Sequence, residues 1–251
     1  MSRRSTGWTE VATGVNRLDV AHVNCYLVVA EGGMTLVDAG LPGTRPLLDS
    51  LLKRLGARRG DIDAVLLTHG HFDHVGMARG LGDEGTGLLV HPEDAALARH
   101  PYRYARERAA WRYPLRYPRT VPGLLSMGRH GALMVKGVDA APRLADGLTL
   151  DVPGRPRVVW TPGHTYGHCA FVFEHLGVVM SGDAIVTFDP YTGAAGPQIV
   201  AGAATADSAR ALESLDALRS ADSAILLPGH GDPWTRGVGE AIDAARRAGS
   251  H

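Results

Sequence analysis

The chain contains 251 residues, of which 26 are acidic and 26 are lysine or arginine, so its formal net charge is zero. This balance gives no overall attraction to nucleic acid or to an anionic membrane, and neither is expected as a partner. No apolar run approaches the ~18 residues of a membrane helix, and residues 1–7 precede no apolar stretch, so no secretory signal is predicted. Cys25 and Cys169 lie in apolar segments, which predicts reduced, buried thiols and a cytoplasmic location.

Short apolar segments and tight turns alternate along the chain. Residues 22–38 predict two strands, and residues 44–56 predict a helix with its leucines on one face. A strand at 64–67 is followed by a helix that begins at Asp73. Further strands are predicted at 87–90, 147–151, 157–161, 169–174, 177–181 and 223–227, and further helices at 204–219 and about 237–248. Strands and helices mix without a clean βαβ alternation, which predicts an α/β fold of two mixed sheets flanked by helices.

A dense group of metal-type ligands follows the predicted strand at 64–67. His69, His71, Asp73 and His74 fall within six residues, in the order H-x-H-x-D-H. Imidazole and carboxylate groups prefer water unless something compensates their burial. Because this group comes directly after an apolar run, it predicts a metal site at the end of a buried strand.

The same pattern recurs at four other places. An apolar segment runs into a tight turn and then into Asp38, His164, Asp183 or His230. If the ends of these strands meet, five histidines and two or three aspartates converge on one pocket. One metal needs three or four ligands, whereas seven ligands suit two metals about 3.5–4 Å apart.

The ordered motifs H-x-H-x-D-H, T-P-G-H-T, S-G-D and P-G-H-G resemble the metallo-β-lactamase fold superfamily over roughly residues 20–235. The resemblance implies an αββα sandwich with the site at one edge of its two sheets. It implies that a first metal is bound by His69, His71 and His164, that a second is bound by Asp73, His74 and His230, and that Asp183 bridges the two. Asp38, in the V-D-A-G segment, would support a ligand rather than bind metal.

Imidazole and carboxylate ligands suit two Zn²⁺ ions, and ligand type alone leaves iron and manganese open. The resulting hypothesis is a metallo-hydrolase of small-molecule substrates, in which a bridging hydroxide attacks a carboxylic ester, thioester or lactone. Asp73 is the candidate proton carrier to the leaving group. His168 is predicted to support a ligand or to be structural, and Tyr166 either binds substrate or packs.

Three other functions use the same residues differently. A phosphodiesterase or nuclease would use the same two-metal core and would need a broad basic tract, which only residues 99–119 offer. A mononuclear iron oxygenase acting on persulfides would need only two histidines and one carboxylate, so the complete second ligand set argues against it. A structural metal protein would have closed coordination.

The spread of ligands along the chain predicts a single domain over residues 1–251, with a helical insertion or lid at about 92–146. Within it, residues 99–119 contain seven arginines, one glutamate and four tyrosines. This segment is interpreted as a solvated helix packed through its aromatic stems, as a cover over the pocket, or as a homodimer contact.

Overall fold

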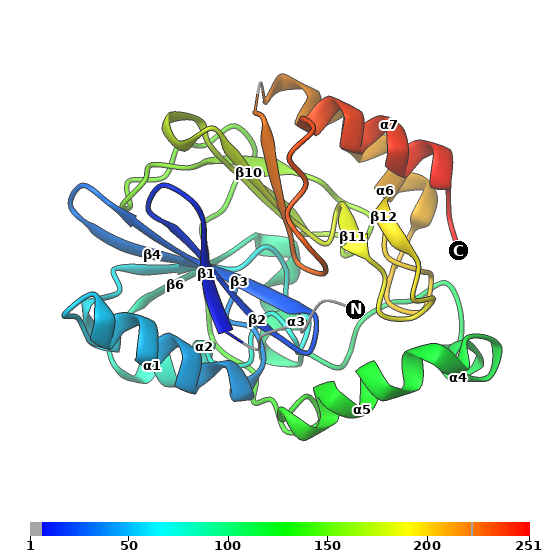
Figure 1. Ribbon diagram of the computed structural model, residues 1–251, viewed down its shortest axis with the longest axis horizontal. Helices are drawn as coiled ribbons and strands as arrows, with labels where there is room; N and C mark the ends of the chain where they lie inside the picture. The colour runs from blue at the N-terminus through cyan, green and yellow to red at the C-terminus, as the bar shows by residue number, and fades with distance from the viewer. Residues whose placement is uncertain (1–6, 222) are drawn as a thin grey trace.

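The computed structural model describes residues 7–221 and 223–251, so the prediction about a secretory signal concerns residues that lie mostly outside the described part. Two main β-sheets pack face to face between layers of helices (Figure 1). The first sheet contains, in spatial order, β1 (Gly7–Ala12), β2 (Val15–Val20), β3 (Val23–Ala30), β4 (Gly33–Val37), β5 (Ala64–Leu66), β6 (Gly87–Val90) and β7 (Ala141–Pro142). The second contains β13 (Ile225–Pro228), β10 (Val178–Gly182), β9 (Cys169–Phe173) and β8 (Arg157–Trp160), and β11 (Val186–Phe188) pairs with β12 (Ala195–Gln198).

The described helices cover the outer faces of the two sheets and one side of the molecule. They are α1 (Arg45–Arg54), α2 (Ala78–Asp83), α3 (Ala95–Arg99), α4 (Arg112–Arg116), α5 (Val121–Arg129), α6 (Ser208–Ser214) and α7 (Val238–Ala248). In Figure 1, α7 lies along the top beside the second sheet, while α4 and α5 run along the bottom. Within the described ranges, no helix combines the length and the apolar character needed to cross a membrane.

The layering follows from the period-two alternation of the strands. In β3, Leu27 packs toward α1, whereas Tyr26 and Val28 face the second sheet. In β9, Phe171 and Phe173 face the first sheet from the opposite side. Each central strand is therefore buried on both faces, and the molecule is the predicted αββα sandwich.

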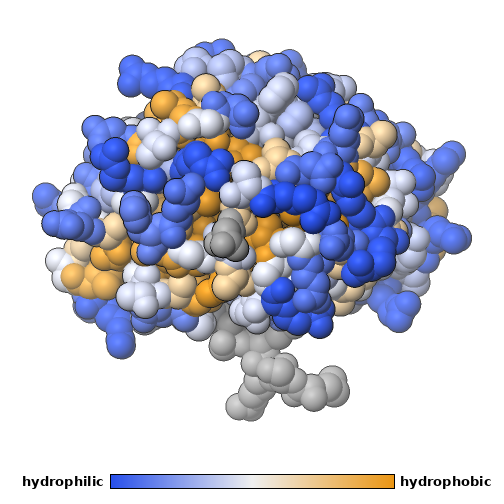
Figure 2. All heavy atoms as spheres, turned by 90° about the horizontal axis from the view of Figure 1, so that it is seen from above, coloured by the Kyte–Doolittle hydropathy of each residue, from blue (hydrophilic) through white to orange (hydrophobic). Residues whose placement is uncertain are grey.

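One outer face of the sandwich is seen from the side of α7 in Figure 2. Hydrophilic side chains project around its edge, and hydrophobic residues gather between them. Val238, Ala241, Ile242 and Ala245 of α7 are buried against the second sheet. The remaining positions of α7, such as Asp243, are exposed, as expected for an amphipathic helix.

The direction of the strands decides where the site can form. β4 and β5 are parallel neighbours in the first sheet, and β10 and β13 are parallel neighbours in the second. β8 runs in the same direction as β10, because both are antiparallel to β9. Polar residues that follow these strands therefore gather at the carboxyl ends, where α/β proteins place their ligands.

Several predicted elements differ from the structure. The helix predicted to begin at Asp73 does not begin until Ala78. The amides of Gly76 and Met77 bind the carbonyl oxygens of Gly40 and Ala39 across the chain, so the intervening residues form turns. Asp73 and His74 therefore project from a turn rather than from the first turn of a helix.

Two further predictions of secondary structure need correction. Residues 147–151 form no strand and contribute only an isolated bridge between Thr149 and Arg157. The helix predicted at 204–219 is shorter, because α6 starts after its N-cap Asp207 and continues as a 3₁₀ helix over Leu215–Ser220. Strands β1 and β2 were not predicted at all.

Candidate metal centre

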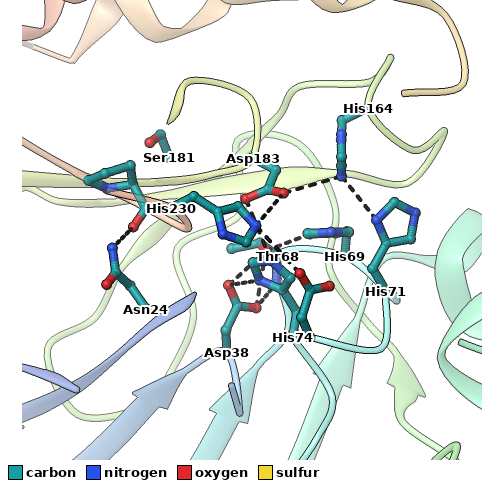
Figure 3. A network of polar contacts seen from close by, with 12 residues as sticks. Asn24, Asp38, Thr68, His69, His71, His74, His164, Ser181, Asp183 and His230 are labelled. Atoms are coloured by element: carbon teal, nitrogen blue, oxygen red, sulfur yellow. Dashed lines mark hydrogen bonds and ion pairs between the residues drawn. The ribbon is translucent and has the colours of Figure 1, made fainter. Parts of the chain in front are cut away.

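Seven buried side chains meet where the two sheets share an edge (Figure 3). They come from loops that directly follow four strands. β5 leads to the first four of them, and β8, β10 and β13 each lead to one. In chain order they are His69, His71, Asp73, His74, His164, Asp183 and His230. The structure thus brings together every residue that the sequence nominated as a metal ligand.

The first group consists of His69, His71 and His164. One ligand atom of each lies within 4.8 Å of the others. His71 Nδ1 and His164 Nε2 are 3.0 Å apart, and the His69 ring meets both neighbouring rings edge to face at centroid distances of 4.6 and 4.7 Å. Three imidazoles that converge in this way offer the nitrogen set of a metal site with open positions.

The second group consists of Asp73, His74 and His230, whose ligand atoms also lie within 4.8 Å of one another. Asp183 stands between the two groups. Its carboxylate oxygens lie 3.5 Å from His74 Nε2, 3.4 Å from His164 Nε2 and 3.3 Å from His230 Nε2. Among the described residues, Asp183 is therefore the one carboxylate that faces both groups, which is the position that a bridging ligand needs.

Asp38 orients two of the imidazoles, that of His74 directly and that of His69 through Thr68. Its Oδ2 accepts from His74 Nδ1 at 2.8 Å. The Thr68 hydroxyl donates to the same carboxylate, so at 3.0 Å it can only accept from His69 Nδ1. In their neutral form both rings therefore carry the proton on Nδ1 and direct the Nε2 lone pair into the cluster. Asp38 thus contacts His74 directly and His69 through Thr68, and its role as support for metal ligands stays a prediction.

Two of the three remaining imidazoles, those of His230 and His164, are also oriented by hydrogen bonds at Nδ1. His230 Nδ1 donates to the carbonyl oxygen of His22 at 2.8 Å. The Thr205 hydroxyl donates to Val200 O, so it accepts from His164 Nδ1 at 3.3 Å. All four rings with a fixed tautomer thus present Nε2 to the centre.

The donor atoms themselves show that this set fits a cation. Within the described residues, His69 Nε2, His71 Nε2, His74 Nε2 and Asp183 Oδ1 are buried and have no hydrogen-bond partner. A buried polar atom without a partner costs free energy. His69, His74 and Asp183 form one group whose ligand atoms lie within 4.8 Å of one another, so their unpartnered atoms are explained if divalent cations bind there.

Protonation differs between the two groups. Burial lowers the pKa of His69 and His71 well below the ordinary value and that of His164 to about 4, so these rings are neutral and ready to bind metal. Burial would also lower the pKa of His74 and His230, but the facing carboxylates, Asp38 and Asp183 respectively, raise it. A cation at the second group would therefore displace protons.

His168 and Tyr166 lie outside the cluster of ligand atoms. His168 Nε2 accepts from the Asp183 amide at 3.0 Å, and its Nδ1 pairs with the Thr161 hydroxyl at 2.8 Å. Both ring nitrogens are occupied, so His168 holds the loop of Asp183. Tyr166 is 45% exposed and lines a separate cavity of about 380 Å³ behind His164.

Asp94 is a site residue that the sequence analysis missed. Its carboxylate accepts from the Gly70 amide at 2.9 Å, the Thr165 hydroxyl at 2.7 Å and the Gly167 amide at 2.9 Å. It thereby ties the loop of the first two histidines to the loop of His164. Pro92-Glu93-Asp94 looks like the acidic start of a helix, and nothing in its local sequence signals this second role.

Glycine at position 70 is explained by close packing and not by an unusual backbone conformation. Its φ is not positive. Instead, a Cβ at this position would lie 2.6 Å from the Ala98 amide nitrogen. Gly70 therefore permits close approach of α3 to the metal motif.

A cavity of about 610 Å³ opens beside the cluster. His71, Asp73, Asp183 and His230 form one wall. The 99–119 segment contributes Tyr102 and Tyr104 to the lining, and α5 with the following turn contributes several apolar side chains. The cavity is within the range of small-molecule sites, and its polar end is the proposed metal centre.

Comparison with known proteins agrees with this geometry. The sequence profile of the metallo-beta-lactamase superfamily matches residues 18–230. The probable metallo-hydrolase YflN of Bacillus subtilis (strain 168) is 30% identical over 254 residues, which covers 93% of this chain and 90% of the relative. The chain therefore belongs to the metallo-beta-lactamase superfamily.

Two solved structures are similar at comparable identity. The metallo-beta-lactamase family protein TTHA1429 from Thermus thermophilus has 28% identity and a TM-score of 0.66, covering 93% of this chain and 78% of that one. TTHA1623, in a di-iron-bound form, has 27% identity and a TM-score of 0.62, covering 91% of this chain and 96% of that one.

Proposed function

We propose that this chain is a hydrolase that uses two divalent metal ions, zinc in the first place, to cleave a carboxylic ester, thioester or lactone. The observation that carries the proposal is the convergence of two ligand groups on the shared carboxylate of Asp183, at the polar end of a cavity. Iron is the alternative metal, because the similar protein TTHA1623 was solved in a di-iron-bound form.

The lining of the cavity favours a neutral carbonyl compound over a phosphodiester. Among the described residues that line it, Arg129 is the one lysine or arginine, and it is exposed. A nucleic acid backbone would need a tract of several cations leading to the metals. A mononuclear iron oxygenase would not need the second ligand group, which consists of Asp73, His74 and His230.

The residues of the chain have separable roles in this proposal. When bound, the two cations would polarise the substrate carbonyl and lower the pKa of water toward neutrality. Asp38 and Thr68 hold the imidazoles in one tautomer. Asp73 lines the cavity with Oδ2 at 3.5 Å from His230 Nε2, and burial raises its pKa. A carboxyl group in this position can carry a proton to the leaving group.

The test is a substrate panel with protein loaded in parallel with zinc, iron(II) or manganese. The panel contains p-nitrophenyl acetate, an acyl-thioester, a lactone, a cephalosporin and bis-p-nitrophenyl phosphate. We expect the carbonyl substrates to have the highest kcat/KM, with about two metal ions per chain. Preference for the phosphodiester, or full activity with one metal ion per chain, would contradict the proposal.

If Asp73 carries a proton to the leaving group, the loss of activity in Asp73→Asn should depend on how basic the leaving group is. In Asp73→Asn, kcat should fall about 100-fold for a phenyl ester and much less for a p-nitrophenyl ester, because p-nitrophenolate leaves without a proton. Metal content is measured for both proteins, so that loss of a ligand is recognised. Equal losses for the two esters at unchanged metal content would refute the role.

A further inference from the structure

The cavity beside the metal centre has a second, apolar wall that the proposed reaction does not use. This wall comes from α5, from the turn that follows it and from residues of two other loops. Its members are Phe72, Tyr102, Leu124, Leu125, Met127, Ala132 and Leu133. The apolar wall is continuous with the ligand cluster, since Asp73 and His230 line the same cavity.

Part of this apolar wall is uncovered. Leu125 is 57% exposed and Leu133 is 82% exposed, although both line the cavity. Large apolar side chains that face a cavity next to a reactive centre are typical of ligand sites. A substrate whose carbonyl reaches the metals would lay its hydrocarbon portion on these leucines.

Two tyrosines line the cavity together with the apolar wall and the ligand cluster. The Tyr104 ring packs on the His71 ring at a centroid distance of 4.1 Å, and Tyr104 and Tyr191 both pack against the small apolar cluster that contains Val200. Asp189 holds Tyr191 in place, because its carboxylate accepts from the Tyr191 amide at 2.9 Å. Because both tyrosines line the cavity, a phenol O–H of this pair can donate to a substrate oxygen.

We propose that the cavity binds an unbranched acyl chain along Leu125 and Leu133, and that the Tyr104–Tyr191 pair donates a hydrogen bond to the carbonyl oxygen at the head of that chain. The substrate class is therefore an ester, thioester or lactone with a hydrocarbon acyl group of several carbons. This inference rests on the proposed function and narrows it.

The first experiment measures kcat/KM of the zinc-loaded protein for p-nitrophenyl esters from acetyl to octanoyl. We expect an increase of about fourfold for each added methylene up to about hexanoyl, since each buried methylene contributes a constant transfer free energy. Leu125→Ser and Leu133→Ser should each lower the hexanoyl-to-acetyl ratio of kcat/KM at least about tenfold. A ratio near one in the unsubstituted protein would overturn the proposal.

The matched control is Leu115→Ser. Leu115 is 77% exposed on α4 and does not belong to the cavity lining. This variant should keep the hexanoyl-to-acetyl ratio, so a general effect of removing an exposed leucine is excluded. If Leu115→Ser lowers the ratio as much as Leu125→Ser does, the leucine wall is not the acyl site.

The tyrosine pair is tested separately. Tyr191→Phe should lower kcat/KM about 10- to 100-fold at every chain length while keeping the hexanoyl-to-acetyl ratio, because it removes a donor and not apolar surface. Tyr117→Phe is the control, since Tyr117 stacks on Tyr113 outside the cavity lining. An unchanged rate in Tyr191→Phe, or an equal loss in Tyr117→Phe, would remove the pair from the proposal.

A binding measurement separates this inference from the proposed hydrolysis. Metal-free protein is titrated with a dansylated undecanoic acid, and octanoate and acetate compete for the probe. We expect displacement by octanoate and not by acetate, and weaker probe binding in Leu133→Ser. Saturable binding without ester hydrolysis would refute the proposed function alone, whereas hydrolysis without octanoate binding would refute the acyl site alone.

Gel filtration tests the alternative that a second copy of the chain covers the apolar wall. The proposal expects the Leu125→Ser/Leu133→Ser variant to elute with the unsubstituted protein. A dimer that is lost in this variant, together with a hexanoyl-to-acetyl ratio near one, would make the wall a subunit interface and overturn the acyl site.

Discussion

Replacing Asp183 with asparagine is expected to lower kcat/KM at least about 1,000-fold, because metal-based charge stabilisation supplies several kcal/mol and each 1.4 kcal/mol is a factor of ten. The carboxylate lies within 3.5 Å of His74, His164 and His230, and no other carboxylate faces both ligand groups in the described part of the chain. Asparagine keeps the shape of the side chain but removes one anionic oxygen, and its amide group would direct hydrogens toward the centre.

The measurement combines metal analysis with kinetics. We expect the number of bound metal ions to fall from about two to one or fewer, with a far-UV circular dichroism spectrum that matches the unsubstituted protein. Asp232→Asn is the control, because this aspartate lies two residues after His230 on the surface and pairs with Arg17. Two bound metal ions and an undiminished rate in Asp183→Asn would show that Asp183 does not bridge the groups.

The strands that lead into the site could be predicted from the sequence because each carries a strong local signal. Val178 to Met180 and Ile225 to Leu227 are continuous apolar runs, as expected for parallel strands buried on both faces. Each run ends in a turn followed by a predicted metal ligand, Asp183 or His230. Local sequence therefore contains both the strand and the position of the polar group at its end.

Strands β1 and β2 could not be recognised in the same way. In β1, Thr9 and Glu10 are exposed and no residue is fully buried. In β2, Arg17 and Asp19 interrupt the apolar pattern, and Arg17 pairs with Asp19 and Asp232. β2 is stabilised by pairing with β3, and β1 by pairing with β2, and no local sequence pattern reports these contacts between strands.

Tertiary contacts also explain the errors near the site. The residues after His71 have a helical composition, but the amides of Gly76 and Met77 are taken by Gly40 and Ala39. Asp94 acquires its role only because two glycine loops come within hydrogen-bond distance of it. The sequence nominates the ligands by residue type, whereas the groups that hold them in place depend on the folded chain.

Asp38 is the residue where a substitution should affect folding and metal binding together. Its carboxylate accepts from the Thr68 amide at 2.8 Å, from the Thr68 hydroxyl and from His74 Nδ1. Its φ is +58°, in the left-handed region that asparagine and aspartate tolerate better than other side chains. Asp38→Asn should therefore keep the backbone and lose the charge, whereas Asp38→Ala loses both the acceptor and a tolerated conformation.

We expect Asp38→Asn to lower the free energy of unfolding of the metal-free protein by about 1–3 kcal/mol and Asp38→Ala by about 3–5 kcal/mol, measured by urea denaturation. Zinc titration should show metal affinity reduced about 10- to 100-fold in both, since His74 loses the partner that fixes its tautomer. Asp38→Gly separates the loss of the carboxylate from the strain of the backbone.

Glycine adopts a positive φ without strain, so the glycine variant should be more stable than the alanine variant by about 1 kcal/mol and should bind zinc equally weakly. If alanine and glycine are equally stable, the backbone at residue 38 carries no strain; if both bind zinc as tightly as the unsubstituted protein, His74 does not depend on Asp38 for its orientation.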